Sequence, residues 1–243
     1  TTNKDWIRNT PYRAWHWKER TIQSDAEYAA LIWSMDENVG KVLDYLKEEG
    51  LYDNTVVCLV SDNGGLSTAE GSPTSNFPLR GGKGWLYEGG IRVPYIIKTP
   101  YMKGSAGICK TPVSSTDFYP TILELTGVTL KPYQHKDGVS LVPLLKGNTV
   151  FDRGAIYFHY PHYGGKGDSP AGAIRKGDYK LIWFYEDDRI ELYNLKMDIS
   201  EKENLAETQK ERALSLQKEL REWLCSCAAK MPVYNPDYKE IKY

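Results

Sequence analysis

The chain has 243 residues, with 31 Lys plus Arg against 32 Asp plus Glu, a formal net charge of −1 and 41% hydrophobic residues. This balance predicts one large or two small folded domains, and it argues against general disorder and against a dedicated nucleic-acid binder. No apolar run approaches the roughly 20 residues that a membrane-spanning helix needs, so we expect no membrane partner either.

Aromatic residues are frequent: seven Trp, 18 Tyr and five Phe make up 12% of the chain. Aromatic rings with a polar tip suit stacking on sugars or wide interfaces, although ordinary core and surface aromatics are the more common explanation. The four cysteines do not decide the redox compartment, because Cys225 and Cys227 are too close in sequence for an unstrained bridge.

The amino-terminal part begins without regular periodicity. Asn and Pro residues interrupt residues 1–23, which we expect to be irregular, and so abrupt a start suggests that a preceding domain is missing. A helix over about residues 25–49 follows. Ser24 and Glu27 form a capping-box pattern, apolar residues recur at helical spacing, and Gly50 supplies the stop. We expect this helix to bury one face.

The next segments indicate an α/β fold. Residues 55–60 are apolar on both faces, which predicts a central strand of a parallel sheet covered by helices. Residues 66–90 form a long loop of the kind that is usually functional. The chain then predicts a strand over residues 93–98, a short helix over residues 117–126 and one more helical turn over residues 141–145.

The pattern changes near residue 150. Short strands are predicted at residues 155–158, 173–175, 179–185 and 189–193. Thr208 and Glu211 repeat the capping box before a closing amphipathic helix. We therefore divide the chain into residues 1–150, an α/β part, and residues 151–243, a small antiparallel sheet packed on a C-terminal helix.

Two positions carry candidate chemistry in the first part. Asp62 and Asn63 follow the apolar strand and could ligate a hard cation, although Asp-Asn-Gly is also common turn chemistry. Lys83 lies among glycines in Arg-Gly-Gly-Lys-Gly at residues 80–84, which suits a sulfate or phosphate group. A solvated loop is the alternative, and the spacing is not that of a P-loop.

Histidines supply the candidates of the second part. His159 and His162 flank Tyr-Pro at the end of a predicted strand, beside a glycine-rich stretch. No partner is spaced to complete a zinc site, so they are either donors to a sugar hydroxyl or an anionic group, or structural residues. His16 and His135 suggest no clear role.

The ordered series of motifs resembles the type I, formylglycine-dependent sulfatases of the alkaline-phosphatase-like superfamily. The matching segments extend from about residue 24 to 206 and comprise residues 35–40, 50–55, 61–65, 79–84, 87–94, 117–121, 174–182 and 191–195. So long a series is specific. The resemblance covers only the carboxyl-terminal portion of that family.

The resemblance implies an alkaline-phosphatase-like α/β sandwich followed by the small sheet-and-helix subdomain. By resemblance, Asp62 and Asn63 match a pair of calcium ligands and Lys83 matches the lysine that contacts the substrate sulfate. This favours the ligand interpretation of Asp62 and Asn63 over the turn. Arg80, His159 and His162 are expected to bind substrate, and we place four aromatic residues around a sulfated-sugar pocket: Trp85, Tyr157, Tyr160 and Tyr163.

The sequence departs from the family in one respect. None of its cysteines or serines lies in the C/S-x-P-x-R motif from which the family makes its formylglycine nucleophile. Two ligands are also too few for calcium, which takes about six to eight oxygens. We therefore expect a missing amino-terminal half to supply the rest, and the chain alone to be inactive and to bind sulfate weakly at best. Export to a periplasm or outside the cell follows from the family alone.

The expected activity is hydrolysis of sulfate esters, and the expected substrate is a sulfated carbohydrate. Three alternatives stay open from the sequence. The chain could be half of a related metal-dependent phosphoesterase, or half of a split enzyme whose partner chain brings the nucleophile. It could also be a non-catalytic module that binds sulfated glycans through Lys83, Arg80 and the aromatic residues.

Overall fold

A computed structural model describes residues 3–10, 13–102, 107–148, 151–166 and 168–237, with side chains from residue 19 onward. The first described element is an antiparallel hairpin of β1 (Asn3–Thr10) and β2 (Arg13–Arg20). The expectation of an irregular start was therefore wrong. Polar and aromatic residues are mixed in this segment without clean alternation, so the period-2 signal of a strand is weak there. The side chain of His16 lies outside the described residues.

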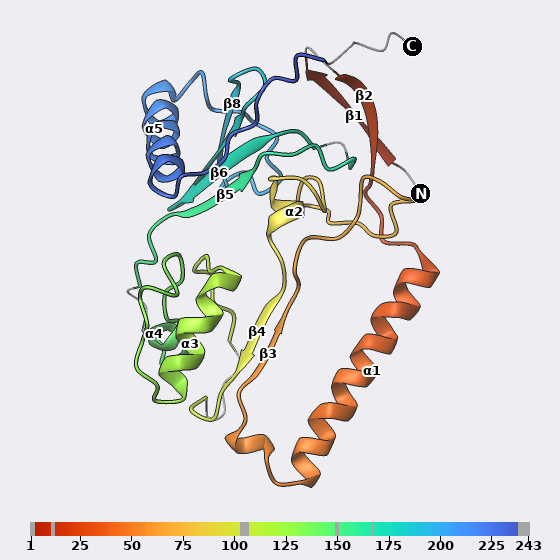
Figure 1. The fold of residues 1–243 in the computed structure, drawn as a ribbon. Helices are drawn as coiled ribbons and strands as arrows, with labels where there is room; N and C mark the ends of the chain where they lie inside the picture. The colour runs from red at the N-terminus through yellow and green to blue at the C-terminus, as the bar shows by residue number, and fades with distance from the viewer. Residues whose placement is uncertain (1–2, 11–12, 103–106, 149–150, 167, 238–243) are drawn as a thin grey trace.

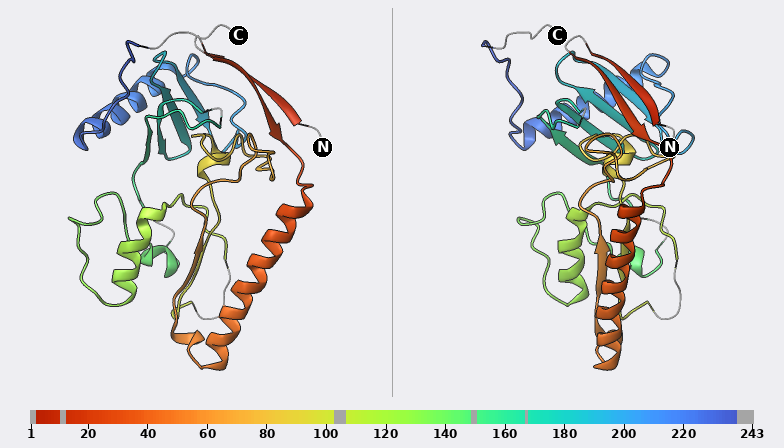
Figure 2. Two further views of the ribbon diagram at one scale, coloured as in Figure 1. Left: turned by 45° about the vertical axis from the view of Figure 1, so that its right-hand side comes forward. Right: turned by 90° about the vertical axis from the view of Figure 1, so that its right-hand side faces the viewer.

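Helix α1 (Ala26–Glu48) occupies nearly the predicted span and ends before Gly50, whose φ of 68° suits the glycine stop. Its amino-terminal cap is Asp25, whose carboxylate accepts a hydrogen bond from the Tyr28 amide at 2.8 Å, so the prediction that Ser24 caps the helix was wrong. No residue of α1 is buried, and Leu31 is 68% exposed. The predicted buried face is thus uncovered, although α1 runs along one side of β3–β4 and approaches it at the end near Gly50 (Figure 1, Figure 2).

Strands β3 (Val57–Val60) and β4 (Tyr95–Lys98) form a two-stranded sheet, joined to α1 through the short 3-10 helix η1 (Tyr52–Asn54). The two strands pair antiparallel, which corrects the expected parallel sheet. Val60 and Ile96 are 41% and 59% exposed, so the sheet is not covered on both faces. An apolar run indicates burial on both faces but does not encode the direction of the neighbouring strand, nor whether this chain supplies the cover.

The segment after β4 folds on the opposite side of β3–β4 from α1 (Figure 1, Figure 2). It contains η2 (Ser115–Asp117), α3 (Phe118–Leu125) and α4 (Val142–Leu145). These elements confirm the short helix and the extra turn that the sequence predicts. The φ of 72° at Gly127 accompanies the end of α3.

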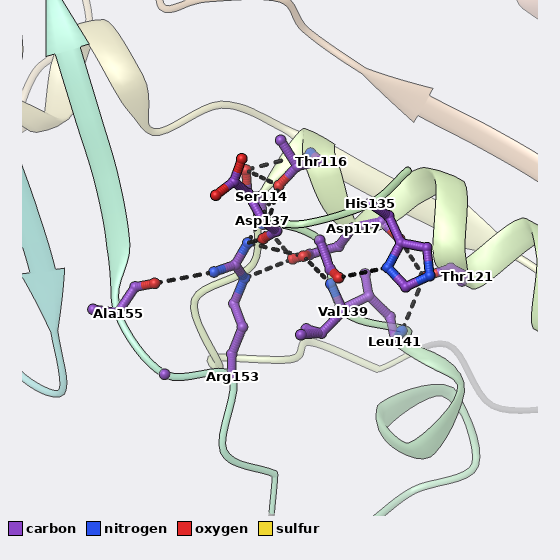
Figure 3. Close-up of polar contacts among 12 residues, drawn as sticks. Ser114, Thr116, Asp117, Thr121, His135, Asp137, Val139, Leu141, Arg153 and Ala155 are labelled. Atoms are coloured by element: carbon purple, nitrogen blue, oxygen red, sulfur yellow. Dashed lines mark hydrogen bonds and ion pairs between the residues drawn. The ribbon is translucent and has the colours of Figure 1, made fainter. Parts of the chain in front are cut away.

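A buried ion pair joins this segment to the second part of the chain (Figure 3). The fully buried Asp117 carboxylate accepts from Nε and Nη2 of Arg153, both at 2.8 Å, and from the amides of Ser114 and Val139. Arg153 also donates to the carbonyl of Ala155, one residue before the four-stranded sheet described below begins. Both carboxylate oxygens of Asp117 have hydrogen-bond partners, so the pair has a structural role: it connects the two parts of the chain close to the predicted boundary at residue 150. The boundary itself stays a prediction.

The second part is a four-stranded antiparallel sheet in the order β5-β6-β7-β8. Its strands are β5 (Ile156–Tyr160), β6 (Ala171–Lys176), β7 (Tyr179–Phe184) and β8 (Ile190–Asn194). Helix α5 (Lys210–Ser226) packs Leu216 and Leu220 on one face of this sheet, against Leu181 and Leu192. The predicted sheet packed on a C-terminal helix is confirmed.

The start of α5 differs in one detail from the sequence prediction. Its amino-terminal cap is Gln209 and no side chain caps it, so the capping box of Thr208 and Glu211 is absent. The Thr208 hydroxyl donates instead to the carbonyl of Leu205 at 3.3 Å. Within the described residues, none of the helices combines the length and the apolar character needed to cross a membrane.

The other face of the second sheet is covered by the first part of the chain. Trp85 and Tyr87, just before the one-turn helix α2 (Glu88–Ile91), are buried against Ile182 and Tyr193 of the sheet. The long loop that carries Lys83 is therefore seated on β6, β7 and β8. This packing positions the candidate site.

Candidate functional site

The first component of the site is the turn after β3, which contains Asp62 and Asn63. The Ser61 hydroxyl donates to the Asn63 carbonyl at 2.8 Å, and the Gly64 amide donates to the Gly90 carbonyl at 2.9 Å. A Cβ on Gly64 would lie 1.8 Å from the Gly89 carbonyl oxygen, so only glycine permits this approach. The turn is thus fixed by its backbone, while Asp62 is exposed and Asn63 is half-buried.

The second component is the glycine loop of residues 80–84, which lies directly against this turn. The Lys83 amide donates to the Gly65 carbonyl at 3.1 Å. A Cβ on Gly82 would lie 2.3 Å from the same carbonyl oxygen. The structure therefore brings Lys83 beside the segment that carries Asp62 and Asn63, and the Lys83 side chain is exposed.

Arg80, the other cation of this loop, points to the four-stranded sheet β5–β8. Its guanidinium lies 3.9 Å from the ring centre of Tyr87, and Nη1 donates to Tyr193 Oη at 3.0 Å and to the Glu201 carbonyl at 2.9 Å. These contacts anchor the glycine loop on β8. The sequence does not reveal this anchoring, because the two hydrogen-bond partners of Arg80 lie more than a hundred residues away.

Beneath α2 lies a buried cluster of charges that sequence reasoning missed. Lys180 on β7 is fully buried, and its Nζ donates to the Leu86 carbonyl and to Glu88, both at 3.0 Å. It also forms an ion pair with Glu201 at 2.5 Å. Glu201 also accepts from the Glu88 amide at 2.7 Å. Burial raises the pKa of the Glu201 carboxyl, and Lys180 opposes that shift. The only signal in the sequence was the alternation of side chains along β7, which places Lys180 on the same face of the strand as the apolar Ile182.

His159 is held by two hydrogen bonds within the second part. Its Nε2 lies 3.0 Å from the Lys230 carbonyl and its Nδ1 lies 2.8 Å from Tyr185 Oη. A carbonyl only accepts, so Nε2 carries the proton and Nδ1 accepts from the tyrosine in the neutral ring. His162 is exposed, and its ring packs edge-on against Tyr160.

The glycine-rich segment after β5 reaches the Lys83 loop. The Lys166 carbonyl accepts from the Trp85 indole at 2.9 Å, and the Lys166 ammonium pairs with Glu70. That pairing lowers the pKa of the Glu70 carboxyl. Trp85 is 4% exposed and Tyr157 stacks on Trp223, so neither ring is free to stack on a sugar, contrary to our expectation. Large rings suit both a core and a binding surface, and their position in sequence does not distinguish the two.

A cation site within this chain has few donors. Among the described residues, no three His, Cys, Asp or Glu side chains come together as a metal-binding group. The oxygens of Asp62 and Asn63 have the chemistry that calcium prefers, but they supply two of the about six to eight ligands that it takes.

Comparison with known proteins decides the family. The family model described as "Sulfatase" matches residues 2–128, and that described as "N-sulphoglucosamine sulphohydrolase, C-terminal" matches residues 81–230. The chain belongs to the sulfatase family. The two matched stretches overlap over the Lys83 loop, β4 and α3, where the two parts of the structure are joined.

Similar proteins are sulfatases throughout this range. A protein named sulfatase from Formosa agariphila is 35% identical over 90% of this chain and 43% of its own length. An N-acetylglucosamine-6-O-sulfatase from Bacteroides thetaiotaomicron is 33% identical over 92% of the chain and 38% of its own length. The chain thus spans less than half the length of these relatives.

The fold agrees with this assignment. The crystal structure of Ps i-CgsB in complex with k-i-k-neocarrahexaose matches 85% of this chain and 44% of its own, with a TM-score of 0.72 and 31% identity. The structure of BT4656 in complex with its substrate D-glucosamine-2-N,6-O-disulfate matches 83% of this chain and 40% of its own, with a TM-score of 0.62 and 31% identity. The predicted alkaline-phosphatase-like fold class is confirmed.

Proposed function

We propose that this chain is the carboxyl-terminal portion of a sulfatase that hydrolyses sulfate esters of a carbohydrate. The observation that carries the proposal is the hydrogen bond between the Lys83 amide and the Gly65 carbonyl. It holds an exposed cation beside two adjacent oxygen donors, Asp62 and Asn63. A cation and a metal-binding pair on one rigid backbone suit an anionic ester.

In this proposal each residue has a distinct role. Lys83 contacts the sulfate group, and Asp62 with Asn63 provides part of a calcium site. Calcium, when bound, neutralises charge on the sulfate oxygens. His162 is exposed and suits a contact with the sugar, whereas Arg80 and His159 are engaged in the hydrogen bonds described above. Arg80 therefore contributes to substrate binding by positioning the Lys83 loop, whereas His159 holds the end of β5 against Tyr185 and Lys230.

The substrate class follows from relatives. The N-acetylglucosamine-6-O-sulfatase and BT4656, with its D-glucosamine disulfate, both act on sulfated sugars. An arylsulfatase J from Mus musculus matches only 40% of this chain, although at 44% identity. The two relatives with a named sugar substrate match 92% and 83% of the chain, which favours a carbohydrate over an aryl ester.

The partner in this proposal is an amino-terminal half of the same enzyme. Helix α1 has no buried residue and exposes large apolar side chains such as Trp33 and Val42, and the β3–β4 sheet exposes Ile96. So much uncovered apolar surface on one part of a chain indicates a binding partner. The relatives have more than half of their length outside the match, enough to cover it. Location in a periplasm or outside the cell is part of the same proposal.

The test is calorimetric titration of the chain with a sulfated disaccharide, with and without Ca²⁺. We expect weak binding that Ca²⁺ strengthens and that Lys83→Ala abolishes, while Lys136→Ala, which removes an exposed lysine elsewhere, has no effect. Binding that is indifferent to Ca²⁺ would favour a non-catalytic glycan-binding module. Robust turnover of an aryl sulfate by the chain alone would contradict the expected need for an amino-terminal half.

A further inference from the structure

Asn76 lies in the long loop between β3 and β4, and its side chain bonds to both components of the candidate site. Its Oδ1 accepts from the Gly65 amide at 3.2 Å, and its Nδ2 donates to the Gly65 carbonyl at 2.8 Å. The same Nδ2 donates to the Gly81 carbonyl at 2.9 Å. One amide group therefore links the turn that carries Asp62 and Asn63 to the loop that carries Lys83.

The surrounding groups fix which way the amide of Asn76 faces. Reversing it would direct Oδ1 at two carbonyl oxygens and Nδ2 at an amide donor, which would lose all three bonds to Gly65 and Gly81. Ser67 supports this arrangement, because its fully buried hydroxyl accepts from Nδ2 at 3.2 Å and donates to the Gly81 carbonyl at 2.9 Å. Nδ2 therefore shares its two N–H groups among three acceptors, two of which are the carbonyls of Gly65 and Gly81.

The glycine loop needs such an anchor. Gly81 has a φ of 72° and Gly82 packs against the Gly65 carbonyl, so neither can bear a side chain that would hold the loop in place. Glycines also lose the most conformational freedom on ordering. A loop of this kind keeps a defined position only when groups outside it bind its backbone, and an anion site requires a defined position.

We propose that Asn76 is a positioning residue that holds Lys83 at a fixed place relative to Asp62 and Asn63. The functional part of this inference rests on the proposed role of Lys83. Asn76 itself does not meet substrate in this scheme. Its Nδ2 acts through the carbonyls of Gly65 and Gly81, so the donors matter and not merely the volume of the side chain.

The test uses amide hydrogen exchange of the full chain, measured by NMR at the amides of Gly65 and Lys83. Asn76→Ala is expected to speed exchange at both amides by about tenfold or more, because the loops open locally once the links are lost. Asn76→Asp is expected to do the same, since it fills the same volume but presents oxygen to the two carbonyls. Protonation of this acid at low pH restores one donor and part of the protection.

Asn204→Ala is the matched control. Asn204 also bonds backbone amides, those of Leu192 and Ala206, both at 2.9 Å, but in the second part of the chain. Its removal should speed exchange there and leave Lys83 unchanged. Unchanged protection of Gly65 and Lys83 in Asn76→Ala, or full protection in Asn76→Asp at neutral pH, would overturn the proposal.

A sulfate titration separates this inference from the proposed function. Sulfate is expected to shift the Lys83 amide resonance of the wild-type chain, and Asn76→Ala should need about fivefold more sulfate for the same shift. An equal requirement in the two proteins would overturn the positioning role. A wild-type chain whose Lys83 does not respond to sulfate would contradict the role of Lys83, while hydrogen exchange would still decide whether Asn76 orders the loop.

Discussion

Replacing Lys180 by Met tests the buried charge cluster beneath α2. Met keeps the length of the aliphatic stem and removes the ammonium, which contacts Glu88 at 3.0 Å and Glu201 at 2.5 Å. Both acids are buried: Glu201 has no exposed surface and Glu88 is 6% exposed. The variant therefore leaves the buried Glu201 carboxylate without this cation and leaves Glu88 with its longer ion pair to the exposed Arg92, at 3.8 Å.

The expected loss is large because removing one partner of a buried ion pair costs about 3–5 kcal/mol of unfolding free energy. An exposed pair on the neighbouring strand provides the comparison. Lys176 pairs with Glu219 at 2.8 Å, but the two side chains are 52% and 29% exposed, so Lys176→Met should cost less than about 1 kcal/mol. Urea unfolding followed by tryptophan fluorescence at pH 7 measures both variants.

The cost of Lys180→Met should also depend on pH. Burial already raises the pKa of Glu201, and loss of the ammonium raises it further. The pKa of Glu201 in the folded variant then lies above the value of about 4.3 in the unfolded chain, so the folded state holds this proton more tightly. The free energy of unfolding of the variant is therefore greatest at low pH and falls as the pH rises through the raised pKa of Glu201. The loss should therefore shrink between pH 7 and about pH 5. A loss no larger than that of Lys176→Met, or one independent of pH, would refute the argument.

Two further predictions concern single side chains. Gly82→Ala should lower the free energy of unfolding, measured in urea, by about 1–3 kcal/mol, because its Cβ would lie 2.3 Å from the Gly65 carbonyl oxygen. Gly40→Ala, in open space on α1, should raise it by up to about 1 kcal/mol. Equal effects of the two substitutions would contradict the close approach of the two loops. Burial is the main cause that raises the pKa of the Tyr157 hydroxyl to about 12. The folded state therefore holds this proton up to a higher pH than the unfolded state, and the free energy of unfolding should fall as the pH rises from about 10 to about 12. Tyr157→Phe should flatten that decline in alkaline urea titrations, and an unchanged slope would show that the ring does not retain its proton.

Much of the fold could be predicted from local patterns. The span of α1, the helix after η2, the four strands of the second sheet and α5 each carry a periodic run of apolar residues long enough to specify the element. The resemblance of eight ordered motifs also indicated the family, which the comparisons confirm. The caps of α1 and α5 were mispredicted because neighbouring polar residues compete for the same position, and sequence does not rank them.

Only some residues of the candidate site could be recognised from the sequence. Asp62, Asn63 and Lys83 were visible in the sequence because glycine-rich polar loops after strands are a local signal. Asn76 and Lys180 were not, because an isolated Asn in a loop and a single Lys in a strand look like solvent-exposed residues. Their roles come from partners that are distant in sequence, such as Gly65 for Asn76 and Glu88 for Lys180.

From α1 onward the sequence by itself determined the main helices and strands, their order and the family, since each of these depends on neighbouring residues, whereas the β1–β2 hairpin was missed. Only the tertiary structure decided that β3 and β4 run antiparallel, that α1 lies uncovered, and that Arg80 anchors its loop on the second sheet. Strand direction and burial depend on which surfaces meet, and a periodic pattern records that a face is apolar without recording what covers it. The contacts that hold Lys83 beside Asp62 and Asn63 arise from backbone carbonyls, which every residue has and no sequence pattern distinguishes.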